Sequence, residues 1–453
     1  MHTLEQLRSG HLAGLTRLDL SAGLTEFPRE IFDLADSLEI LNLSGNALSA
    51  LPDDLPRLRK LRVLFCSDNQ FTSVPEVLGQ CLQMSMIGFK ANQIRTLPAA
   101  ALPPLLRWLI LTDNQLESLP PEIGNCSHLQ KLMLAGNQLT SLPGTLANCT
   151  NLGLLRIAAN QLTELPAWLL ALPRLSWLAY AGNPFSAAVV ARHPIAAIEW
   201  AQLHLEQQLG EGASGVIYRA AWHRGAAVPT EVAVKLFKGA VTSDGLPHSE
   251  MAACISAGQH PNLIAVKGKI AQHPAGAEGL VLALVDPVFG NLAGPPSLAS
   301  CTRDVYAPSV VFGLAAAQRL AQGIAAAAAH LHAQGILHGD LYGHNILYTK
   351  AGESLLGDFG AACFFDPADI ATAHALQRLE VRAFGCLLEE LLAHCPEMVA
   401  VPAVQQQWQE LLARCMQPEV AARPLFAEIE QVLVSVSNEP IVSNEEKLSN
   451  NPR

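Results

Sequence analysis

Leucines and asparagines recur along the first half of the chain with a period close to 23 residues. The asparagines share one frame and follow each other at intervals of 23, 23, 22, 23, 23 and 23 residues, at positions Asn46, Asn69, Asn92, Asn114, Asn137, Asn160 and Asn183. A shorter first copy runs from Leu15 to Pro28. The pattern predicts about eight units, which is more than the three or so that a stacked array needs for stability.

Each unit carries the leucine pattern L-x-x-L-x-L ahead of its asparagine, for example over residues 38–43 and 129–134. Alternate leucines of a short strand would point into a core. The asparagine would turn the chain, and its amide could satisfy backbone groups left unpaired there. Because no unit can bury its apolar edge alone, the units are expected to stack into a solenoid. The pattern resembles the leucine-rich-repeat family over residues 12–186, which implies an α/β solenoid.

The non-leucine strand positions of such a solenoid would face its concave surface. Two columns of these positions are rich in apolar side chains, and Arg156 is a further member of the second column. Their aromatic and apolar members, with Leu154 among them, form a stripe that we expect to bind a partner: Phe65, Met86, Trp108, Ile110, Met133 and Trp177. Exposed apolar patches usually mark binding surfaces, and Trp and Met are typical of interfaces. The expected partner is another protein or the second half of this chain; alternatively, flanking side chains cover the stripe.

Composition narrows the function classes. The net charge of −11 argues against nucleic-acid binding, which needs a basic face. The N-terminus lacks a basic flank followed by an apolar run, so no signal peptide is expected. The most apolar stretch, Leu314 to Ile336, is interrupted by Arg319 and other polar residues, which favours a buried helix over a membrane span. These features predict a cytoplasmic protein with reduced thiols.

The second half of the chain begins after a short segment, residues 187–202, which is expected to be a linker. It opens on a glycine-rich stretch, residues 209–218, with the pattern G-x-G-x-x-G-x-Ile. Glycines let backbone N–H groups approach a phosphate closely. The stretch Val232-Ala233-Val234-Lys235 follows, and a lysine there could bridge the α- and β-phosphates of a nucleotide. Glu250, at the start of a helix-like stretch, could hold that lysine in an ion pair; otherwise it is an ordinary solvated helix residue.

Two further motifs follow in order. The first reads His338-Gly339-Asp340-Leu341-Tyr342-Gly343-His344-Asn345, and the second Gly357-Asp358-Phe359-Gly360. An aspartate five residues before an asparagine places a proton acceptor beside a metal ligand on one loop. The second motif adds the carboxylate oxygens that Mg²⁺ prefers. A phosphate clamp with hard oxygen ligands is what phosphoryl transfer needs.

These motifs resemble the eukaryotic-like protein kinase family over residues 203–435. The resemblance implies a two-lobed α+β fold that binds ATP and Mg²⁺ and transfers the γ-phosphate to protein hydroxyl groups, serine or threonine more than tyrosine. By it, Asp340 accepts the proton of the substrate hydroxyl, whereas Asn345 and Asp358 hold Mg²⁺. It also implies an ATP-binding set: Leu209, Gly210, Glu211, Gly212, Ala213, Ser214, Gly215, Ile217, Ala233, Lys235, Glu250, Ala283 and Val285. Residues 436–453, rich in Ser, Asn and Glu, are expected to be a disordered tail.

The sequence departs from the family pattern at several places. Gly339 replaces the usual Arg, so phosphorylation of the activation segment is not expected to be the switch. Tyr342 replaces the usual Lys, so stabilisation of the γ-phosphate is weaker or comes from His344. The stretch 360–380 is short and lacks an A-P-E triplet, which leaves Arg423 without its usual partner. Glu380 stands where the family has Asp.

Two alternatives remain open. One is a pseudokinase scaffold that binds proteins without catalysis. The other is a small-molecule kinase, because aminoglycoside phosphotransferases share the pattern H-G-D-L-x-x-x-N. The glycine-rich loop with V-A-V-K and the Arg423-Pro424 segment favour a protein kinase.

Overall fold

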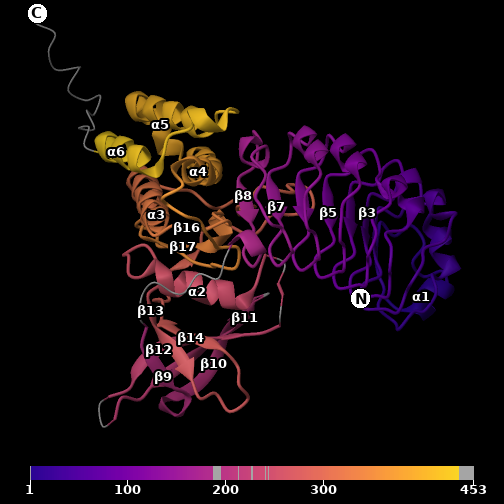
Figure 1. Cartoon of the computed structure of the whole chain (residues 1–453), viewed down its shortest axis with the longest axis horizontal. Coiled ribbons are helices and arrows are strands. Elements are labelled where there is room, and N and C mark those ends of the chain that lie inside the picture. The colour runs from indigo at the N-terminus through magenta and orange to yellow at the C-terminus, as the bar shows by residue number, and fades with distance from the viewer. Residues whose placement is uncertain are drawn as a thin grey trace, which may run out of the picture.

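The repeats form one parallel sheet in a curved array (Figure 1). The computed structural model describes residues 2–186, 195–212, 214–225, 228–239, 241–242 and 244–437. Its first sheet runs in chain order through β1 (Arg17–Asp19), β2 (Ile40–Asn42), β3 (Val63–Phe65), β4 (Met86–Gly88), β5 (Trp108–Ile110), β6 (Lys131–Met133), β7 (Leu154–Arg156) and β8 (Trp177–Ala179). Equivalent residues of neighbouring repeats pair, as Trp108 with Lys131 and Leu154 with Trp177. The predicted solenoid is confirmed.

The asparagines hold neighbouring repeats together, as predicted. Asn114 Nδ2 donates to the carbonyl oxygens of Phe89, at 2.9 Å, and of Leu111, at 3.1 Å. Its Oδ1 accepts from Ile94 N at 2.9 Å. One amide therefore satisfies backbone groups in two adjacent repeats.

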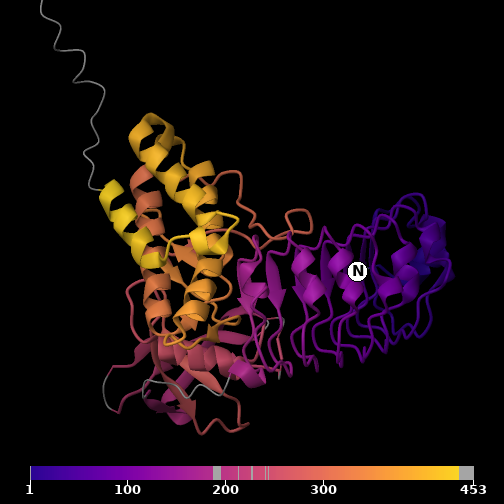
Figure 2. The same cartoon turned by 45° about the horizontal axis from the view of Figure 1, so that its top comes forward.

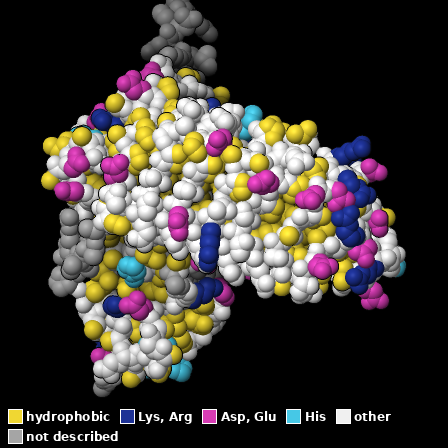
Figure 3. Space-filling view, turned by 45° about the vertical axis from the view of Figure 1, so that its right-hand side comes forward, with side chains coloured by type: hydrophobic (Ala, Val, Ile, Leu, Met, Phe, Trp, Pro, Cys, Tyr) yellow, Lys and Arg dark blue, Asp and Glu magenta, His cyan; other side chains and the backbone are white. Residues whose placement is uncertain are grey.

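Short helices complete the array. A short α-helix, α1 (Leu4–Arg8), begins with a capping box, in which Thr3 and Gln6 bond each other's backbone N–H groups. The 3₁₀-helices that connect the strands are η1 (Arg29–Leu34), η2 (Leu55–Arg57), η3 (Glu76–Gln80), η4 (Ala99–Ala101), η5 (Pro121–Asn125), η6 (Gly144–Asn148), η7 (Leu169–Ala171) and η8 (Pro184–Ser186). Charged side chains gather on the end of the array farthest from the second half of the chain (Figure 3).

A small lobe begins the second half. Its mixed sheet has the order β10-β11-β12-β14-β13-β9. The elements are β9 (Ala197–Glu199), η9 (Trp200–Gln202), β10 (Leu203–Glu211), β11 (Gly215–Trp222), β12 (Thr230–Phe237), α2 (Pro247–Ala257), β13 (Val266–Ala271) and β14 (Gly279–Ala283). Part of the segment expected to be a linker is thus a strand, because Ala197–Glu199 pairs in parallel with β13 and buries Ile198. The segment ends in η9, and its first part, residues 187–194, lies outside the described residues.

A large, mainly helical lobe follows. Its elements are β15 (Gly290–Asn291), α3 (Leu314–Ala333), β16 (Ile336–Leu337), η10 (Gly343–Asn345), β17 (Ile346–Tyr348), β18 (Ser354–Leu356), β19 (Cys363–Phe364), α4 (Ile370–Ala393), η11 (Pro396–Ala400), α5 (Pro402–Cys415), η12 (Val420–Ala422) and α6 (Phe426–Ser437). The apolar stretch singled out in the sequence is α3, whose Leu320, Ile324 and Leu331 are fully buried. Across the described residues, no helix has the length and apolarity needed to cross a bilayer. Most of the expected tail, residues 438–453, lies outside them.

The last repeats pack directly on the large lobe (Figure 2). One apolar core runs from the leucines of the array to Leu337, Cys363 and Leu376 of the large lobe. At the edge of this core, Tyr180 Oη donates to the Phe364 carbonyl at 3.1 Å, and Arg423 donates to the Pro173 carbonyl at 2.7 Å. The two halves of the chain therefore share one hydrophobic core.

The apolar stripe is divided by this contact. Trp177 and Leu154 are buried within the core of the large lobe, and Met133 packs against that core. Met86 is also buried, whereas Phe65, Trp108 and Ile110 remain half-buried on the array. The C-terminal part of the stripe therefore contacts the second half of the chain, one of the two partners expected from the sequence.

Candidate active site

A cavity of about 200 Å³ lies between the two lobes. Its apolar walls include Ile217, Val266 and Leu282. Its polar lining comes from the glycine-rich hairpin, from β12, from the loop between β12 and α2, from α2 and from the loop after β18. It includes Ser214, Lys235, Thr242, Asp244, Glu250 and Asp358. The cavity therefore joins an apolar wall to a group of charged side chains, as a nucleotide site requires.

Lys235 and Glu250 form a buried ion pair inside this cavity. Burial by itself would lower the pKa of Lys235, but the carboxylates of Glu250 and Asp358 outweigh it and raise that pKa. Burial raises the pKa of Glu250, and Lys235 opposes this shift. Lys235 stays a cation facing Asp358, which is the arrangement needed to hold a phosphate.

The loop between β16 and β17 presents Asp340. Asn345 Nδ2 donates to Asp340 Oδ2 at 2.7 Å and to its carbonyl oxygen at 2.9 Å. His338 supports the same loop, because its Nε2 lies 2.9 Å from the Gly357 carbonyl and its ring packs on Phe359, with centroids 5.1 Å apart. The loop is thus tied to the residues on either side of Asp358.

Asp358 and Asn345 carry oxygen atoms of the kind that Mg²⁺ prefers as ligands. Asp358 faces the cavity with a left-handed backbone, φ 52°, and its Oδ1 accepts from Gly360 N at 3.2 Å. Both contacts of the Asn345 side chain with Asp340 use the amide nitrogen, so the amide oxygen is the atom that could serve a metal. The described residues hold no group of three or more His, Cys, Asp or Glu that could bind a metal. The donor set fits a magnesium ion that also draws ligands from nucleotide phosphates.

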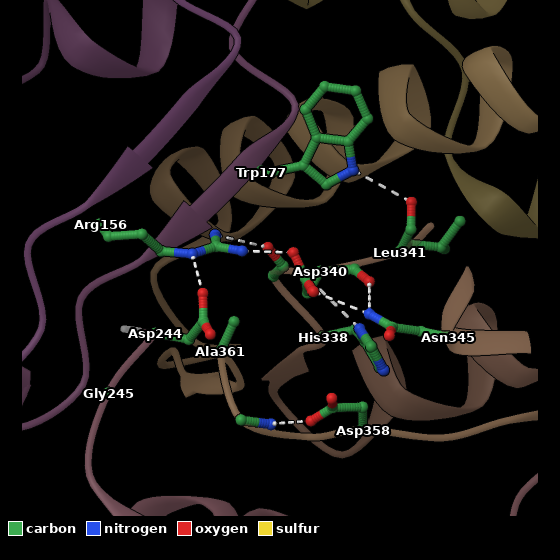
Figure 4. A network of polar contacts seen from close by, with 12 residues as sticks. Arg156, Trp177, Asp244, Gly245, His338, Asp340, Leu341, Asn345, Asp358 and Ala361 are labelled. Atoms are coloured by element: carbon green, nitrogen blue, oxygen red, sulfur yellow. Dashed lines mark hydrogen bonds and ion pairs between the residues drawn. The ribbon is translucent and has the colours of Figure 1, made fainter. Parts of the chain in front are cut away.

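Arg156, on β7 of the repeats, reaches into this site and is 1% exposed. Its guanidinium donates to Asp340 Oδ1, to Asp244 Oδ1 at 2.7 Å and to the Gly339 carbonyl at 3.0 Å (Figure 4). Burial would lower the pKa of Arg156, but the two carboxylates raise it above its usual value. For Asp340, burial by itself would raise the pKa, but Arg156 and the nearby histidines outweigh burial and bring that pKa below its ordinary value. Asp340 is therefore held as an anion by a cation of the repeats.

Trp177, on β8, covers the next residues of the same loop. Its ring stacks on Tyr342, with centroids 4.2 Å apart and an interplanar angle of 5°. Its Nε1 donates to the Leu341 carbonyl at 3.0 Å. The departure from Lys to Tyr at position 342 thus creates a flat partner for a tryptophan of the repeats.

Gly339 has a steric reason to be glycine. Its φ of +74° lies in the left-handed region, and a Cβ there would lie 2.5 Å from the Ala361 carbonyl oxygen and 2.7 Å from that of Leu178. Leu178 belongs to β8, so a side chain at position 339 would collide with the repeats. Glycine at position 339 therefore fits beside both the Ala361 carbonyl of the large lobe and the array, and Arg156 brings a guanidinium to the Gly339 carbonyl.

Glu380 holds the same loop from α4. Its Oε1 accepts from Gly339 N at 2.7 Å, and its Oε2 accepts from His338 N at 3.3 Å. His332 Nε2 lies 2.7 Å from Oε2. The longer Glu in place of Asp therefore bonds two successive loop N–H groups.

The residues predicted from the sequence are only partly brought together. Those lining the cavity are Gly212, Ser214, Gly215, Ile217, Lys235, Glu250 and Asp358. Those outside its lining are Leu209, Gly210, Glu211, Ala233, Ala283, Val285, Asp340 and Asn345. Ala213 lies outside the described residues. The sequence did not predict that Asp244 lines the cavity or that Arg156 binds Asp340. The glycine at position 339 was the one signal that another part of the chain approaches this loop closely.

Comparisons with known proteins match the two halves of the chain to two kinds of family. Residues 203–385 match the family described as protein tyrosine and serine/threonine kinase, and residues 37–58 and 104–162 match leucine-rich-repeat families. A serine/threonine-protein kinase of Streptomyces coelicolor, PkaA, is 30% identical over 261 residues, or 51% of this chain and 46% of that protein. A probable leucine-rich repeat receptor-like protein kinase of Arabidopsis thaliana is 28% identical over 219 residues, or 44% of this chain and 30% of that protein. This chain thus spans less than half of each relative.

A leucine-rich-repeat protein of Leptospira interrogans with a solved structure is 31% identical, with a TM-score of 0.37, and the match covers 39% of this chain and 45% of that one. The chain joins leucine-rich repeats to a domain of the protein kinase family.

Proposed function

We propose that the chain is an ATP-dependent protein kinase that phosphorylates serine or threonine hydroxyls of protein substrates. The observation that supports this most is the Lys235–Glu250 ion pair facing Asp358 in one cavity, with Asp340 and Asn345 on the adjoining loop. The similarity to serine/threonine-protein kinases supports the same reaction. The repeats would bind a partner or regulate the kinase domain, and the core that they share with the large lobe supports this role.

In this proposal, ATP with Mg²⁺ supplies the phosphoryl group and the charge that offsets its oxygens. Lys235 would hold the α- and β-phosphates, while Asp358 and the Asn345 amide oxygen would be the protein's metal ligands. Asp340 would accept the proton of the attacking hydroxyl. A general base must lie about 2.6–3.2 Å from that proton's donor atom, so a lone pair of an Asp340 carboxylate oxygen has to face the hydroxyl during transfer.

The reaction is tested with Lys235→Met, Asp340→Ala and Asp358→Asn. Phosphate transfer to the chain itself and to dephosphorylated casein is followed by mass spectrometry with Mg-ATP. Each variant should lose transfer about a hundredfold or more, because each removes a charge that acts on the reacting groups. Arg62→Ala is the matched control, since Arg62 forms only an exposed pair with Glu39 in the repeats.

A pseudokinase scaffold is the second candidate. It is favoured by one observation, that Oδ1 and Oδ2 of Asp340 are both engaged, by Arg156 and by Asn345. Transfer is therefore measured in the wild-type chain and in Arg156→Ala. If both bind nucleotide and neither transfers phosphate, the enzymatic proposal is refuted and the scaffold stands.

A further inference from the structure

We infer that the concave face of the last two repeats is a docking surface for the chain's own catalytic loop, residues 338–345. We further infer that Arg156 inhibits the kinase by binding the carboxylate of Asp340. The inference rests on the proposed function and adds its regulation. The evidence lies in three contacts that the repeats make with the residues around Asp340.

The first contact removes the proton acceptor. Arg156 takes Asp340 Oδ1 while Asn345 takes Oδ2. The side chain of Asp340 is 16% exposed and that of Arg156 is 1% exposed. Because a general base must bond directly to the substrate hydroxyl, the hydroxyl has to compete with the guanidinium and the amide for the lone pairs of this largely buried carboxylate.

The second contact fixes the loop that leads from β12 to α2. Asp244 on this loop binds Arg156 Nε at 2.7 Å. The loop also lies against the repeats, since a Cβ on Gly136 would lie 2.8 Å from Val241 and one on Gly182 would lie 2.5 Å from Leu246. One arginine therefore ties the repeats to both lobes, and it places a third carboxylate in the cavity beside Asp358.

The third contact blocks the approach of a protein substrate. The Trp177 ring covers Tyr342, and the Leu178 carbonyl lies beside Gly339. The segment between Gly360 and the start of α4 at Ile370 is too short to hold the large lobe away from the repeats. Strands β7 and β8 thus occupy the space in front of the catalytic loop that a substrate chain would need.

An opposite role for Arg156 is the main rival. A cation beside Asp340 could support transfer in place of the lysine that Tyr342 replaces. The two roles predict opposite changes in kinase activity when Arg156 is removed. Activity rises if the contact inhibits, and falls if the contact supports catalysis. A merely structural role would lower activity together with stability.

The test uses the full chain and compares Arg156→Ala with wild type, with Arg62→Ala as the control. Initial rates with Mg-ATP and dephosphorylated casein are measured, together with the melting temperature. Arg156→Ala should raise kcat/KM for casein by about tenfold or more. Arg156→Lys, which keeps one charge but not the three-way fork, should fall between wild type and alanine.

Trp177→Ala provides a second route to the same result, since it weakens the docking without touching Arg156. A rise in activity despite a lower melting temperature in either variant supports the inference. Equal or lower activity in both variants, with wild-type activity abolished by Asp340→Ala, overturns the inference and leaves the kinase proposal intact. Absence of transfer in wild type and in both variants, with nucleotide bound, refutes the kinase proposal and this inference with it.

Discussion

Trp177 should be one of the most stabilising residues of the chain, although it lies at a strand position that faces away from the leucine core. Its side chain is 2% exposed, stacks on Tyr342 and bonds the Leu341 carbonyl. Replacing a buried Trp by Ala costs about 3–5 kcal/mol, and a buried carbonyl left without its donor costs about 1–3 kcal/mol. Trp177→Ala should therefore destabilise the chain by about 4 kcal/mol or more.

Trp108 is the matched control, because it occupies the same column of the sheet three strands earlier. Its ring is half-buried, its Nε1 lies 3.4 Å from Met133 Sδ, and Lys131 Nζ sits 4.6 Å from the ring centroid. A contact of this kind contributes about 1 kcal/mol. Trp108→Ala should therefore cost far less than Trp177→Ala.

The two variants are compared by urea denaturation and by melting temperature. For a domain of 150–250 residues, each kcal/mol lowers the melting temperature by about 2–4 °C, so Trp177→Ala should melt roughly 10 °C below wild type. Hydrogen exchange of residues 338–345 should rise in Trp177→Ala and stay unchanged in Trp108→Ala. If the two variants lose equal stability, or if exchange of that loop is unchanged in Trp177→Ala, the docking described here does not exist in solution.

Two further predictions concern the large lobe. Glu380→Gln should cost about 1–3 kcal/mol at pH 7, because one of the two oxygens that accept from Gly339 N and His338 N becomes an NH2 group, which cannot accept. Burial alone would raise the pKa of Glu380, but His332, His338 and the Gly339 N–H lower it below its ordinary value. The ionised carboxylate therefore stabilises the fold above pH ~4.3, and this stabilisation is lost as the pH falls through the pKa of the folded state. The difference in melting temperature between wild type and Glu380→Gln should thus shrink below pH ~4, and a constant difference would contradict the assignment. Thr372→Ala should keep near-normal phosphotransfer, because Thr372 lies in the first turn of α4, next to the Asp369 cap, and Gly339 offers no cation for a phosphate; a tenfold loss with ATP binding intact would refute this.

The sequence predicts most of the fold because its signals are local. Each repeat carries its own leucines and its own asparagine, so the period alone determines the stack. The glycine-rich loop, Lys235 and the motifs around Asp340 and Asp358 are likewise read from short stretches. The strand at Ala197–Glu199 was missed, because it pairs with β13 at residues 269–271, far along the chain.

The contact between the halves could not be predicted in the same way. The repeat pattern correctly places Arg156 on the concave face. Its partners, Asp244 and Asp340, are far away in the sequence, so the pattern could not identify them. The neighbouring column includes Trp108 and Trp177 without showing which of them the large lobe covers. Only packing of the two halves distinguishes these positions.

Gly339 limits how this protein can be recombined. A side chain at position 339 would collide with the Leu178 carbonyl of the repeats as well as with the Ala361 carbonyl of the large lobe. A catalytic domain with the usual arginine there could not be grafted onto these repeats in the same pose, and these repeats would not seat on such a domain. The two halves therefore act as a matched pair rather than as interchangeable modules, so a chimera that exchanges either half should restore the pairing only when it carries the glycine together with the last repeat.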